Sequence, residues 1–414
     1  MDQFEAHTRT ERPSIGVATG LSGLSVPFSW QGSTLRVVSG HDQVTAIGRH
    51  LRELGLTRAM LVSSPSTSSG WAARVIRQAL CDRIVERFET VPPHSGEDTV
   101  ADGVELARKA EIDCIIAVGG GSVSDTAKAI LIVLAEGGEI GDHANVFDPP
   151  DRYEQKHLGE IKLPLIVVPT TASAAEVTPG LGIRARTGHK MVFWDHNVVP
   201  RLILLDPGAF SDTPAAVLAA TGMNAFAHCV EGTYSRVANP ISTALALHAA
   251  RGLTIALPAL ARDPSDVGAK VMLMTAAHLS GHVISNARVG LHHAICHGLG
   301  SLGGMSHGDA NAIMLPHVMR YNAEAAETEL AMLAEAMGAS RAEHSVAQLA
   351  SDAISRVEAL QSASGVPIRL RDRNLNRSLI PLIAQKTLSD RGAYFNPRPA
   401  PPEEDIKALL EAAW

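Results

Sequence analysis

The sequence has few of the features that mark secreted, membrane or nucleic-acid-binding proteins. It contains four cysteines in 414 residues, and none of them forms a CxxC pair. Isolated cysteines favour buried free thiols in a reducing cytoplasm over a disulfide framework. No block of Lys or Arg stands out. The formal net charge of −7 therefore gives no support to binding of nucleic acid or of a membrane surface.

Long hydrophobic runs and targeting segments are also missing. No stretch of about 18 uncharged apolar residues appears, so the sequence predicts no membrane-spanning helix. The first 25 residues contain several charges and no apolar core segment, which excludes a signal peptide. We interpret residues 1–25 as a loosely held arm and expect the protein to be cytoplasmic.

The length and the hydrophobic pattern predict two further regions. A chain of 414 residues exceeds the size at which one core keeps growing. Up to residue 210, short apolar segments alternate with helical patterns, which indicates a parallel sheet with helices on its faces. The apolar segments are residues 34–38, 59–63, 113–118 and 163–168, the helical ones 97–110 and 124–136, and residues 137–157 are expected to be a loop. The spacing from residue 213 onward is helical. We therefore predict an α/β domain over 26–210 and an all-α domain over 211–414.

Two turns at the ends of predicted strands are suited to binding a phosphate group. Gly119–Ser122 (GGGS) lies between a strand and a helix, where backbone N–H groups and the helix N-terminus attract an anion. Hydroxyl side chains follow a second strand in the same way. The GGGS turn is neither a Walker loop nor a GxGxxG fingerprint, and by itself it could be a tight connection only. Lys190 could bind a phosphate or be a solvated loop lysine. The candidate cofactor-binding residues are Gly120, Gly121, Ser122, Asp125, Thr170, Thr171, Ser173 and Lys190.

Histidines gather in the helical half. His293 and His297 are four residues apart and lie on one face of a predicted helix, and His307 follows a Gly-rich turn. Upstream, Asn224 and His228 form a second pair with the same spacing. Such a set describes either a divalent-metal pocket or a polar hydride-transfer pocket. We assign ligand-type positions to His228, His293 and His307 and a proton-relay role to His297. Cys296 is expected to be a small buried hydrophobe, His292 is as well placed facing away as facing the pocket, and Glu231 is expected to form a structural salt bridge.

Six segments together resemble the iron-containing alcohol dehydrogenase superfamily, which shares its fold with dehydroquinate synthase. They occur in order from about residue 33 to the C-terminus. The segments are GGGSVSDTAKAI (119–130), PTTASAAEVT (169–178), GMNAFAHCVEG (222–232), HHAICHGLG (292–300), HGDANAIMLPHVMRYN (307–322) and FNPRP (395–399). The resemblance implies an N-terminal dinucleotide-binding α/β domain, a C-terminal helical domain, an active site between them, and a homodimer or larger homo-oligomer.

The resemblance also implies roles for particular residues. The GGGS turn binds the pyrophosphate of NAD(P)H, and the PTT segment with Ser173 holds the nicotinamide side. The family's metal is held by one Asp and three His, and the histidine positions are His228, His293 and His307. The Asp position is Asn224 in this chain.

The Asn at position 224 is the departure that matters most. An amide removes one negative charge from the ligand set, which weakens binding of hard ions such as Fe²⁺, while three histidines can still hold Zn²⁺. Asn224 and the HHxxCHxLG pattern are similar to the maleylacetate reductase branch, whose members generally work without a catalytic metal. The segment from His307 to Asn322 instead looks like the metal-dependent alcohol dehydrogenases.

A second departure concerns the choice of cofactor. NAD-selective relatives have an Asp after the second strand, where this chain reads Val62-Ser63-Ser64-Pro65. Without that carboxylate nothing repels the 2′-phosphate of NADP(H). The sequence therefore predicts that NADP(H) is tolerated beside NAD(H).

The function that we expect is reduction of a small carbonyl or enone by NAD(P)H, as in maleylacetate reductases. Arg288 could pair with a substrate carboxylate or be an exposed helix arginine. An Fe²⁺- or Zn²⁺-dependent alcohol dehydrogenase is the alternative. A dehydroquinate synthase-like lyase is the remoter alternative, because additional Lys and Arg anchors for phosphate are not evident around the histidines.

Overall fold

The computed structural model describes residues 28–33, 35–150, 152–398 and 401–414. The predicted arm over residues 1–25 lies outside them. The described residues form two compact units, one comprising Ser33–Ala225 with Ile255–Gly281, and the other Phe226–Thr254 with His282–Trp414 and residues up to Gly32. We call the first the sheet unit and the second the histidine unit. Each unit is made of separate chain segments, and helices α6, α7 and α8 contribute residues to both.

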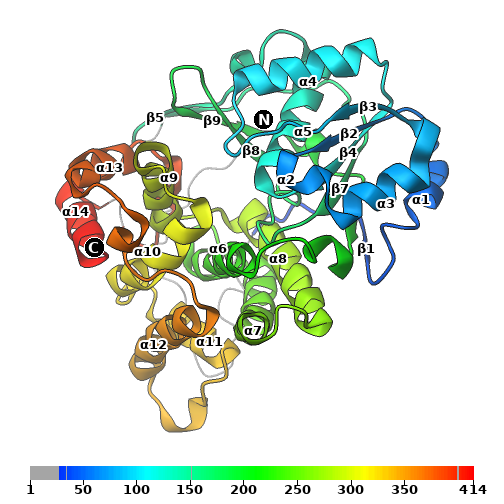
Figure 1. The fold of residues 1–414 in the computed structure, drawn as a ribbon. Coiled ribbons are helices and arrows are strands. Elements are labelled where there is room, and N and C mark those ends of the chain that lie inside the picture. The colour runs from blue at the N-terminus through cyan, green and yellow to red at the C-terminus, as the bar shows by residue number, and fades with distance from the viewer. Residues whose placement is uncertain (1–27, 34, 151, 399–400) are drawn as a thin grey trace. The chain divides into compact units, whose positions relative to one another are not determined.

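The described strands all belong to the sheet unit (Figure 1). They are β1 (Arg36–Ser39), β2 (Ala59–Ser63), β3 (Ile84–Phe88), β4 (Cys114–Gly119), β5 (Val146–Asp148), β6 (Arg152–Glu154), β7 (Leu165–Pro169), β8 (Gly180–Arg184), β9 (Lys190–Trp194) and β10 (Leu202–Leu205). Six of them form a parallel sheet in the order β1-β10-β7-β4-β2-β3, which confirms the predicted α/β architecture.

The helices have the following bounds. They are α1 (Ile47–Glu53), α2 (Pro65–Ser68), α3 (Trp71–Leu80), α4 (Glu97–Lys109), α5 (Gly121–Glu136), α6 (Ala215–Tyr234), α7 (Pro240–Arg262), α8 (Val267–Ala287), α9 (Leu291–Gly303), α10 (His307–Asn322), α11 (Glu327–Ala336), α12 (Val346–Ser364), α13 (Ile380–Thr387) and α14 (Glu403–Ala412). Short 3₁₀ turns connect several of them. One of these, η9 (Arg391–Phe395), borders the histidines described below.

Helices cover both faces of the parallel sheet, with α4 and α5 on one side and α1 and α3 on the other (Figure 1). The central strands β2, β4 and β7 are buried along their whole length, as expected for strands packed on both faces. A hydrophobic cluster joins α1 and α3 to the sheet through residues such as Ile76, Ile116 and Ile166. The histidine unit has its own core, built mainly from α9, α10, α13 and α14.

Three expectations about elements need correction. The helix after β4 begins at Gly121 and not at residue 124, so the last two residues of the GGGS turn are its first turn. Residues 137–157 are not only a loop, because β5 and β6 pair there as an antiparallel hairpin. Strands β3 and β10 and the hairpin β8–β9 are additional to the expected ones.

Helix α7 is long and apolar enough, with a mean hydropathy of 1.4 over 18 residues, to cross a bilayer. This is weak evidence for a span, because core helices pass the same test. The exposed Arg251 near the middle of α7 would cost about 3 kcal/mol at the centre of a bilayer.

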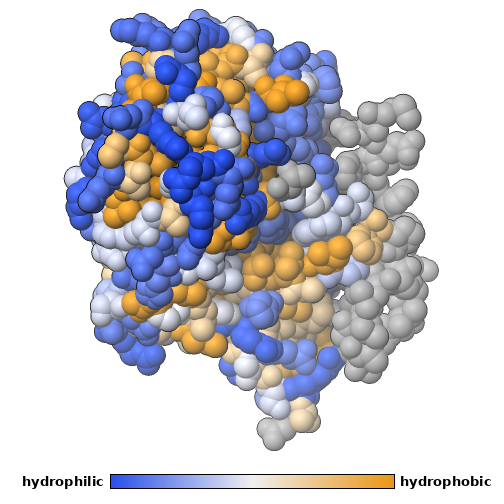
Figure 2. Space-filling view, turned by 90° about the vertical axis from the view of Figure 1, so that its right-hand side faces the viewer, coloured by the Kyte–Doolittle hydropathy of each residue, from blue (hydrophilic) through white to orange (hydrophobic). Residues whose placement is uncertain are grey.

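On the face drawn in Figure 2, groups of hydrophobic residues are separated by hydrophilic ones.

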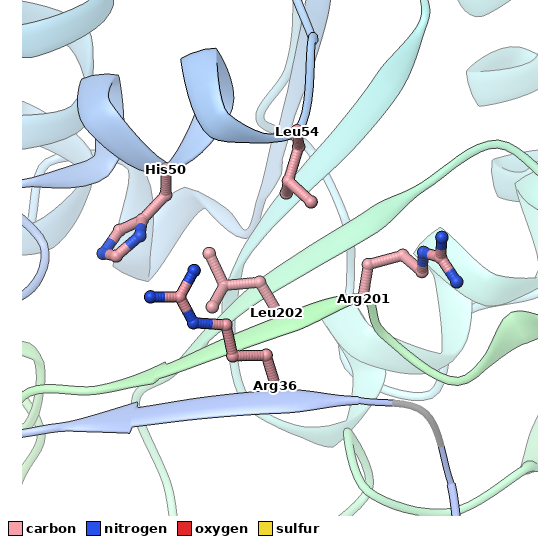
Figure 3. A pocket seen from close by; sticks show the side chains of 5 residues that line it. All are labelled: Arg36, His50, Leu54, Arg201 and Leu202. Carbon is pink, nitrogen blue, oxygen red and sulfur yellow. The ribbon is translucent and has the colours of Figure 1, made fainter.

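A cavity of about 240 Å³ lies at the amino ends of β1 and β10. Its lining residues are Arg36, His50, Leu54, Arg201 and Leu202 (Figure 3). Ligands of open parallel sheets collect at the opposite, carboxyl ends of the strands. This cavity is therefore not the candidate active site, which we build from the residues at those ends and from the histidines.

Candidate active site

The two predicted phosphate-binding turns leave the sheet side by side. Strands β4 and β7 are neighbours whose register places Gly119 opposite Pro169. The backbone N–H of Thr170 donates to the carbonyl oxygen of Gly119 at 3.1 Å. The structure therefore brings the glycine turn and the Thr-Thr turn together at one point of the sheet edge.

The glycine turn leaves no room for a side chain at Gly120. A Cβ atom on Gly120 would lie 2.8 Å from Oγ1 of Thr171, whereas a Cβ on Gly121 would meet only ordinary contacts. Gly120 is the N-cap of α5, so unpaired backbone N–H groups of the first helical turn lie beside it. The hydroxyl oxygen of Thr171 is buried and has no hydrogen-bond partner. A narrow cradle with helix N–H groups and an orphaned hydroxyl fits the diphosphate and amide of a nicotinamide dinucleotide.

Other candidate cofactor-binding residues form hydrogen bonds within and around the two turns. Ser122 Oγ accepts a hydrogen bond from the N–H of His94 at 3.2 Å, and Ser173 Oγ accepts one from Ala175 at 3.5 Å. Asp125 Oδ2 accepts the N–H of Gly182 in β8 at 3.1 Å. Burial raises the pKa of Asp125, against the opposing charges of Lys128 and Lys190. Lys190 is exposed at the start of β9 and faces this carboxyl group from the hairpin.

The loop after β7 is anchored by an ammonium group that the sequence analysis did not single out. Lys128 in α5 is fully buried, and its Nζ donates to the carbonyl oxygens of Ala175, Thr178 and Gly180 at 2.6, 2.6 and 3.3 Å. Burial lowers the pKa of Lys128 to about 8 while the carboxyl groups of Asp125 and Glu176 oppose that shift. This ammonium ties α5 to the segment that carries the cofactor-binding hydroxyls.

Helix α6 carries the predicted pair of Asn224 and His228 in its second half. Asn224 Nδ2 donates to the carbonyl oxygen of Ser173 at 3.3 Å, so this amide holds the loop after β7. One turn later His228 is buried, and Glu231 follows with no exposed surface. Asn224 belongs to the sheet unit and His228 to the histidine unit, with the helix continuous through both.

The histidine unit brings the four predicted histidines together. The ring centroids of His228 and His293 are 5.0 Å apart, and those of His293 and His307 are 5.5 Å apart. His297 lies 6.3 Å from His293 and stacks on His307 at 5.5 Å with 14° between the planes. Two imidazoles that bind one ion in a tetrahedral arrangement have centroids roughly 5 Å apart, given a Zn–N bond near 2.1 Å. The spacings of the ring pairs His228–His293 and His293–His307 are close to this value, as expected for imidazoles that share an ion.

Local backbone features explain how His307 reaches α9. Gly304 ends α9 in the left-handed conformation with φ of 65°, which reverses the chain. Ser306 then caps α10 by accepting the N–H of Asp309 at 3.1 Å, and His307 is the first residue of that helix. The Gly-rich turn predicted from the sequence thus returns the chain onto the face of α9.

Glu231 forms hydrogen bonds that hold the start of α9 and the ring of His293 in place. Among the described residues its ion-pair partners are His292 and His293, not Lys or Arg. Its Oε1 accepts the N–H groups of Gly290 and His292 at 2.9 and 3.0 Å, which caps the N-terminus of α9. Its Oε2 is hydrogen-bonded to Nδ1 of His293. Burial raises the pKa of Glu231, but the charge of His293 and hydrogen bonds from both histidines outweigh burial and hold it below the ordinary value. Because Nδ1 of His293 is engaged, His293 reaches a ligand through Nε2.

The geometry of the described residues also contains a compact group of Glu231, His292 and His293 with metal-ligand atoms within 4.8 Å of one another. These atoms are already bonded within the protein, since His292 Nε2 lies 2.9 Å from the carbonyl oxygen of Asn311. His292 thus faces the protein interior. We interpret this group as the support of His293, not as a separate ion site.

Burial sets the protonation of the deeper rings. Burial lowers the pKa of His228 well below its ordinary value, and the neighbouring His293 adds to the shift. Burial also lowers the pKa of His293, although Glu231 opposes it. Burial therefore favours the neutral form of both rings, the form that ligates a metal or donates a single hydrogen bond. Cys296 is a buried free thiol of the apolar core, as expected.

Two residues near the histidines need comment. Arg288, expected to be a partner of a substrate carboxylate or an exposed helix arginine, follows the end of α8 with a φ of 64° and precedes α9, so it lies on neither helix. Asp390, which the sequence analysis missed, lies beside His297, with Oδ2 2.6 Å from Nδ1 of the ring. It is 93 residues away in the sequence. No local spacing could have revealed it.

Comparison with known proteins identifies the family of the chain. The sequence model of the family "Iron-containing alcohol dehydrogenase" matches residues 34–207, and that of "Fe-containing alcohol dehydrogenase family, C-terminal" matches residues 218–414. The chain is 32% identical to 1,3-propanediol dehydrogenase of Klebsiella pneumoniae, over 91% of this chain and 96% of that protein. It is also 32% identical to maleylacetate reductase 2 of Cupriavidus pinatubonensis, over 92% of this chain and 94% of that protein.

A solved structure of 1,3-propanediol oxidoreductase superposes with a TM-score of 0.86 at 31% identity, covering 94% of this chain and all of that one. Members of the matched family use NAD(P)H and a divalent metal. The cradle at Gly120 and the ring spacings of His228, His293 and His307 are consistent with these two groups. The chain therefore belongs to the iron-containing alcohol dehydrogenase family, near its maleylacetate reductase branch, and is a nicotinamide-dependent oxidoreductase.

Proposed function

We propose that the protein reduces a small carbonyl or enone compound with NAD(P)H, in the manner of a maleylacetate reductase. The observation that carries this proposal is Asn224, which stands one turn before His228 where the family's metal-binding carboxylate is expected. Its amide bonds the carbonyl oxygen of Ser173. A neutral ligand set weakens binding of hard ions, so the imidazoles themselves are suited to binding the substrate oxygen.

In this proposal the histidines share the work at the carbonyl group. His228, His293 and His307 bind the substrate oxygen through hydrogen bonds and orient it, and His297 delivers the proton. Bound NAD(P)H supplies the hydride. The cradle at Gly120 and Gly121, with Ser122 and the hydroxyls of Thr170, Thr171 and Ser173, holds the dinucleotide in place. An electron-poor substrate suits this site, because its enolate is stabilised before the proton arrives.

A metal-dependent alcohol dehydrogenase is the second candidate. It is favoured by the three neighbouring imidazoles of His228, His293 and His307, because burial lowers the pKa of His228 and of His293 and so favours the neutral form that ligates Zn²⁺ or Fe²⁺. Such an ion would supply Lewis-acid polarisation of the substrate oxygen. Several relatives have names of alcohol-oxidising enzymes, including 1,3-propanediol dehydrogenase. A lyase resembling dehydroquinate synthase is the remoter candidate.

Metal analysis combined with a substrate assay separates these candidates. We expect consumption of NAD(P)H with maleylacetate, followed at 340 nm, to persist after chelator treatment, with metal well below one ion per chain. One ion per chain, with chelator-sensitive oxidation of 1,3-propanediol, would instead establish the metal-dependent dehydrogenase. Product formation without a net change at 340 nm would indicate the lyase.

Three broader features belong to the same proposal. We propose a domain boundary near residue 210, supported by family matches that end at residue 207 and resume at residue 218. We also propose a homodimer or larger homo-oligomer and a cytoplasmic location. Gel filtration with light scattering tests the first of these two, and fractionation of cells tests the second.

A further inference from the structure

We propose that Asp390 is a positioning residue for proton transfer, fixing the tautomer and the orientation of His297. This inference rests on the proposed role of His297 as the proton carrier. The central observation is the contact of 2.6 Å between Oδ2 of Asp390 and Nδ1 of His297. A carboxylate can only accept, so Nδ1 of the ring carries the hydrogen and Nε2 on the opposite side exchanges the proton with substrate.

Asp390 is itself held in place by the backbone. Its Oδ1 accepts the N–H of Gly392 at 2.8 Å and caps the short 3₁₀ turn η9. A side chain at Gly392 would crowd that same oxygen at 3.0 Å and the carbonyl oxygen of Gly290 at 3.2 Å. The segment therefore packs tightly against the start of α9. One oxygen is thus fixed by the turn, and the other lies at hydrogen-bond distance from Nδ1 of His297.

The rest of the surroundings defines the plane of the imidazole. The ring stacks on His307 with centroids 5.5 Å apart and 14° between the planes. The side chain of His297 is 25% exposed and that of Asp390 is 27% exposed, in contrast to the buried His293. A partly exposed dyad next to buried imidazoles is placed at the boundary between protein and solvent, where a proton must pass. A hydrogen bond at Nδ1 and stacking on one face together leave the ring little freedom to rotate.

The consequence for the reaction can be written with balanced protons. In reduction, imidazolium His297 donates the Nε2 proton to the substrate oxygen, and the neutral ring keeps its Nδ1 hydrogen on Asp390. In alcohol oxidation, neutral His297 accepts the hydroxyl proton at Nε2 and becomes imidazolium beside the same carboxylate. Asp390 keeps its hydrogen bond to Nδ1 in both directions and does not itself gain or lose a proton.

Asp390→Asn distinguishes positioning from a purely structural role. Asn keeps an oxygen for the N–H of Gly392, so the cap and the fold persist. Its amide nitrogen is a donor, however, and binds the other tautomer of His297, with the hydrogen on Nε2. We expect kcat to fall by roughly 10²-fold or more while KM, the dissociation constant of NAD(P)H and the melting temperature stay near the wild-type values.

Two additional variants make the result decisive. Asp352→Asn, which removes a carboxylate paired with Arg356 in α12 of the same unit, is the control for loss of charge and should leave kcat unchanged. His297→Ala combined with Asp390→Asn should be no slower than His297→Ala alone, because the two residues act as one device.

The possible outcomes distinguish an error in the role of His297 from an error in the role of Asp390. If His297→Ala retains wild-type turnover, the role of His297 in the proposed function is wrong. If His297→Ala is slow but Asp390→Asn turns over normally, only the positioning role is wrong. A loss in Asp390→Asn that merely adds to the loss in His297→Ala would likewise overturn the coupling of the two residues.

Discussion

At the scale of single residues, Glu231 shows how one buried carboxylate can serve several groups. It caps α9 through the N–H groups of Gly290 and His292 and binds Nδ1 of His293. The helix N-terminus and the imidazole both favour negative charge, which explains why a fully enclosed carboxylate stays ionised. The residue, expected from the sequence to form a structural salt bridge, lies within ion-pair distance of His292 and His293 and supports the candidate site.

We predict that Glu231→Gln destabilises the protein by about 2–4 kcal/mol, because its amide group presents a donor where His293 needs an acceptor. Any affinity of the histidine set for Zn²⁺ should fall about 10- to 100-fold as well, since the orientation of His293 is lost. Denaturant unfolding and metal titration measure the two effects. Glu358→Gln is the control, because its ion pair with Arg320 is exposed and should contribute less than about 1 kcal/mol.

At the scale of elements, the N-terminus of α5 is formed by Gly120 and Gly121. Because glycine has no side chain, the N–H groups of the first helical turn are left accessible. Gly121→Ala should not disturb the free protein, because its new Cβ lies 3.6 Å or more from its neighbours. The methyl group would, however, occupy the space next to the helix N–H groups where we propose that the diphosphate binds. We expect the dissociation constant of NADH, measured by fluorescence titration, to rise at least about tenfold, equivalent to about 1.4 kcal/mol.

Gly48→Ala is the matched control for Gly121→Ala. Gly48 lies in α1 of the same unit, and a Cβ at this position also meets only ordinary contacts. It should leave cofactor binding unchanged and stabilise α1 by up to about 1 kcal/mol. Unaltered NADH affinity in Gly121→Ala would remove the glycine turn from the cofactor site.

The loop after β2 carries the prediction on cofactor choice. Ser64 caps α2 and lies at the carboxyl end of β2, where an acidic residue would repel a 2′-phosphate. Ser64→Asp retains a capping side chain and adds charge, so we expect kcat/KM for NADPH to fall at least about tenfold relative to that for NADH. Ser64→Asn caps without charge and is the control. A wild-type preference for NADH above about a hundredfold would contradict the premise that NADPH is tolerated.

The same elements show what sequence patterns can and cannot predict. Strands β2, β4 and β7 were predictable because they are continuous apolar runs, buried on both faces. Strand β3 was missed because it lies at the edge of the sheet and contains Glu86 and Arg87. The convergence of His293 and His307 follows from the i,i+4 spacing and the turn at Gly304, which are local. Asp390 and the three carbonyl partners of Lys128 are set by tertiary packing, for which one sequence has no signal.

At the scale of the whole molecule, we expect the free energy of unfolding to depend on pH through Glu176, a buried carboxyl group that has no role in the proposed reaction. Glu176 is 3% exposed in the loop after β7, and burial raises its pKa to about 7 against the attraction of Lys128. Between the ordinary value of 4.5 and pH 7, the folded chain therefore binds more protons at this site than the unfolded chain. The stability that Glu176 contributes is fully present below pH 4.5 and is lost as the pH rises through 7.

Glu176→Gln should remove this slope, since glutamine keeps the shape of the neutral acid at every pH. We expect the free energies of unfolding of variant and wild type to be similar at pH 5, and the variant to be more stable by about 1–3 kcal/mol at pH 8. The remaining ammonium of Lys128 keeps its three carbonyl acceptors, so loss of its acidic neighbour reduces this gain but does not reverse it.

Urea unfolding at the two pH values measures the difference, with the exposed Glu105→Gln in α4 as control. A difference that is the same at pH 5 and pH 8 would show that Glu176 is ionised in the folded protein at both, and that the loop beneath the cofactor cradle is more open to water than its packing indicates.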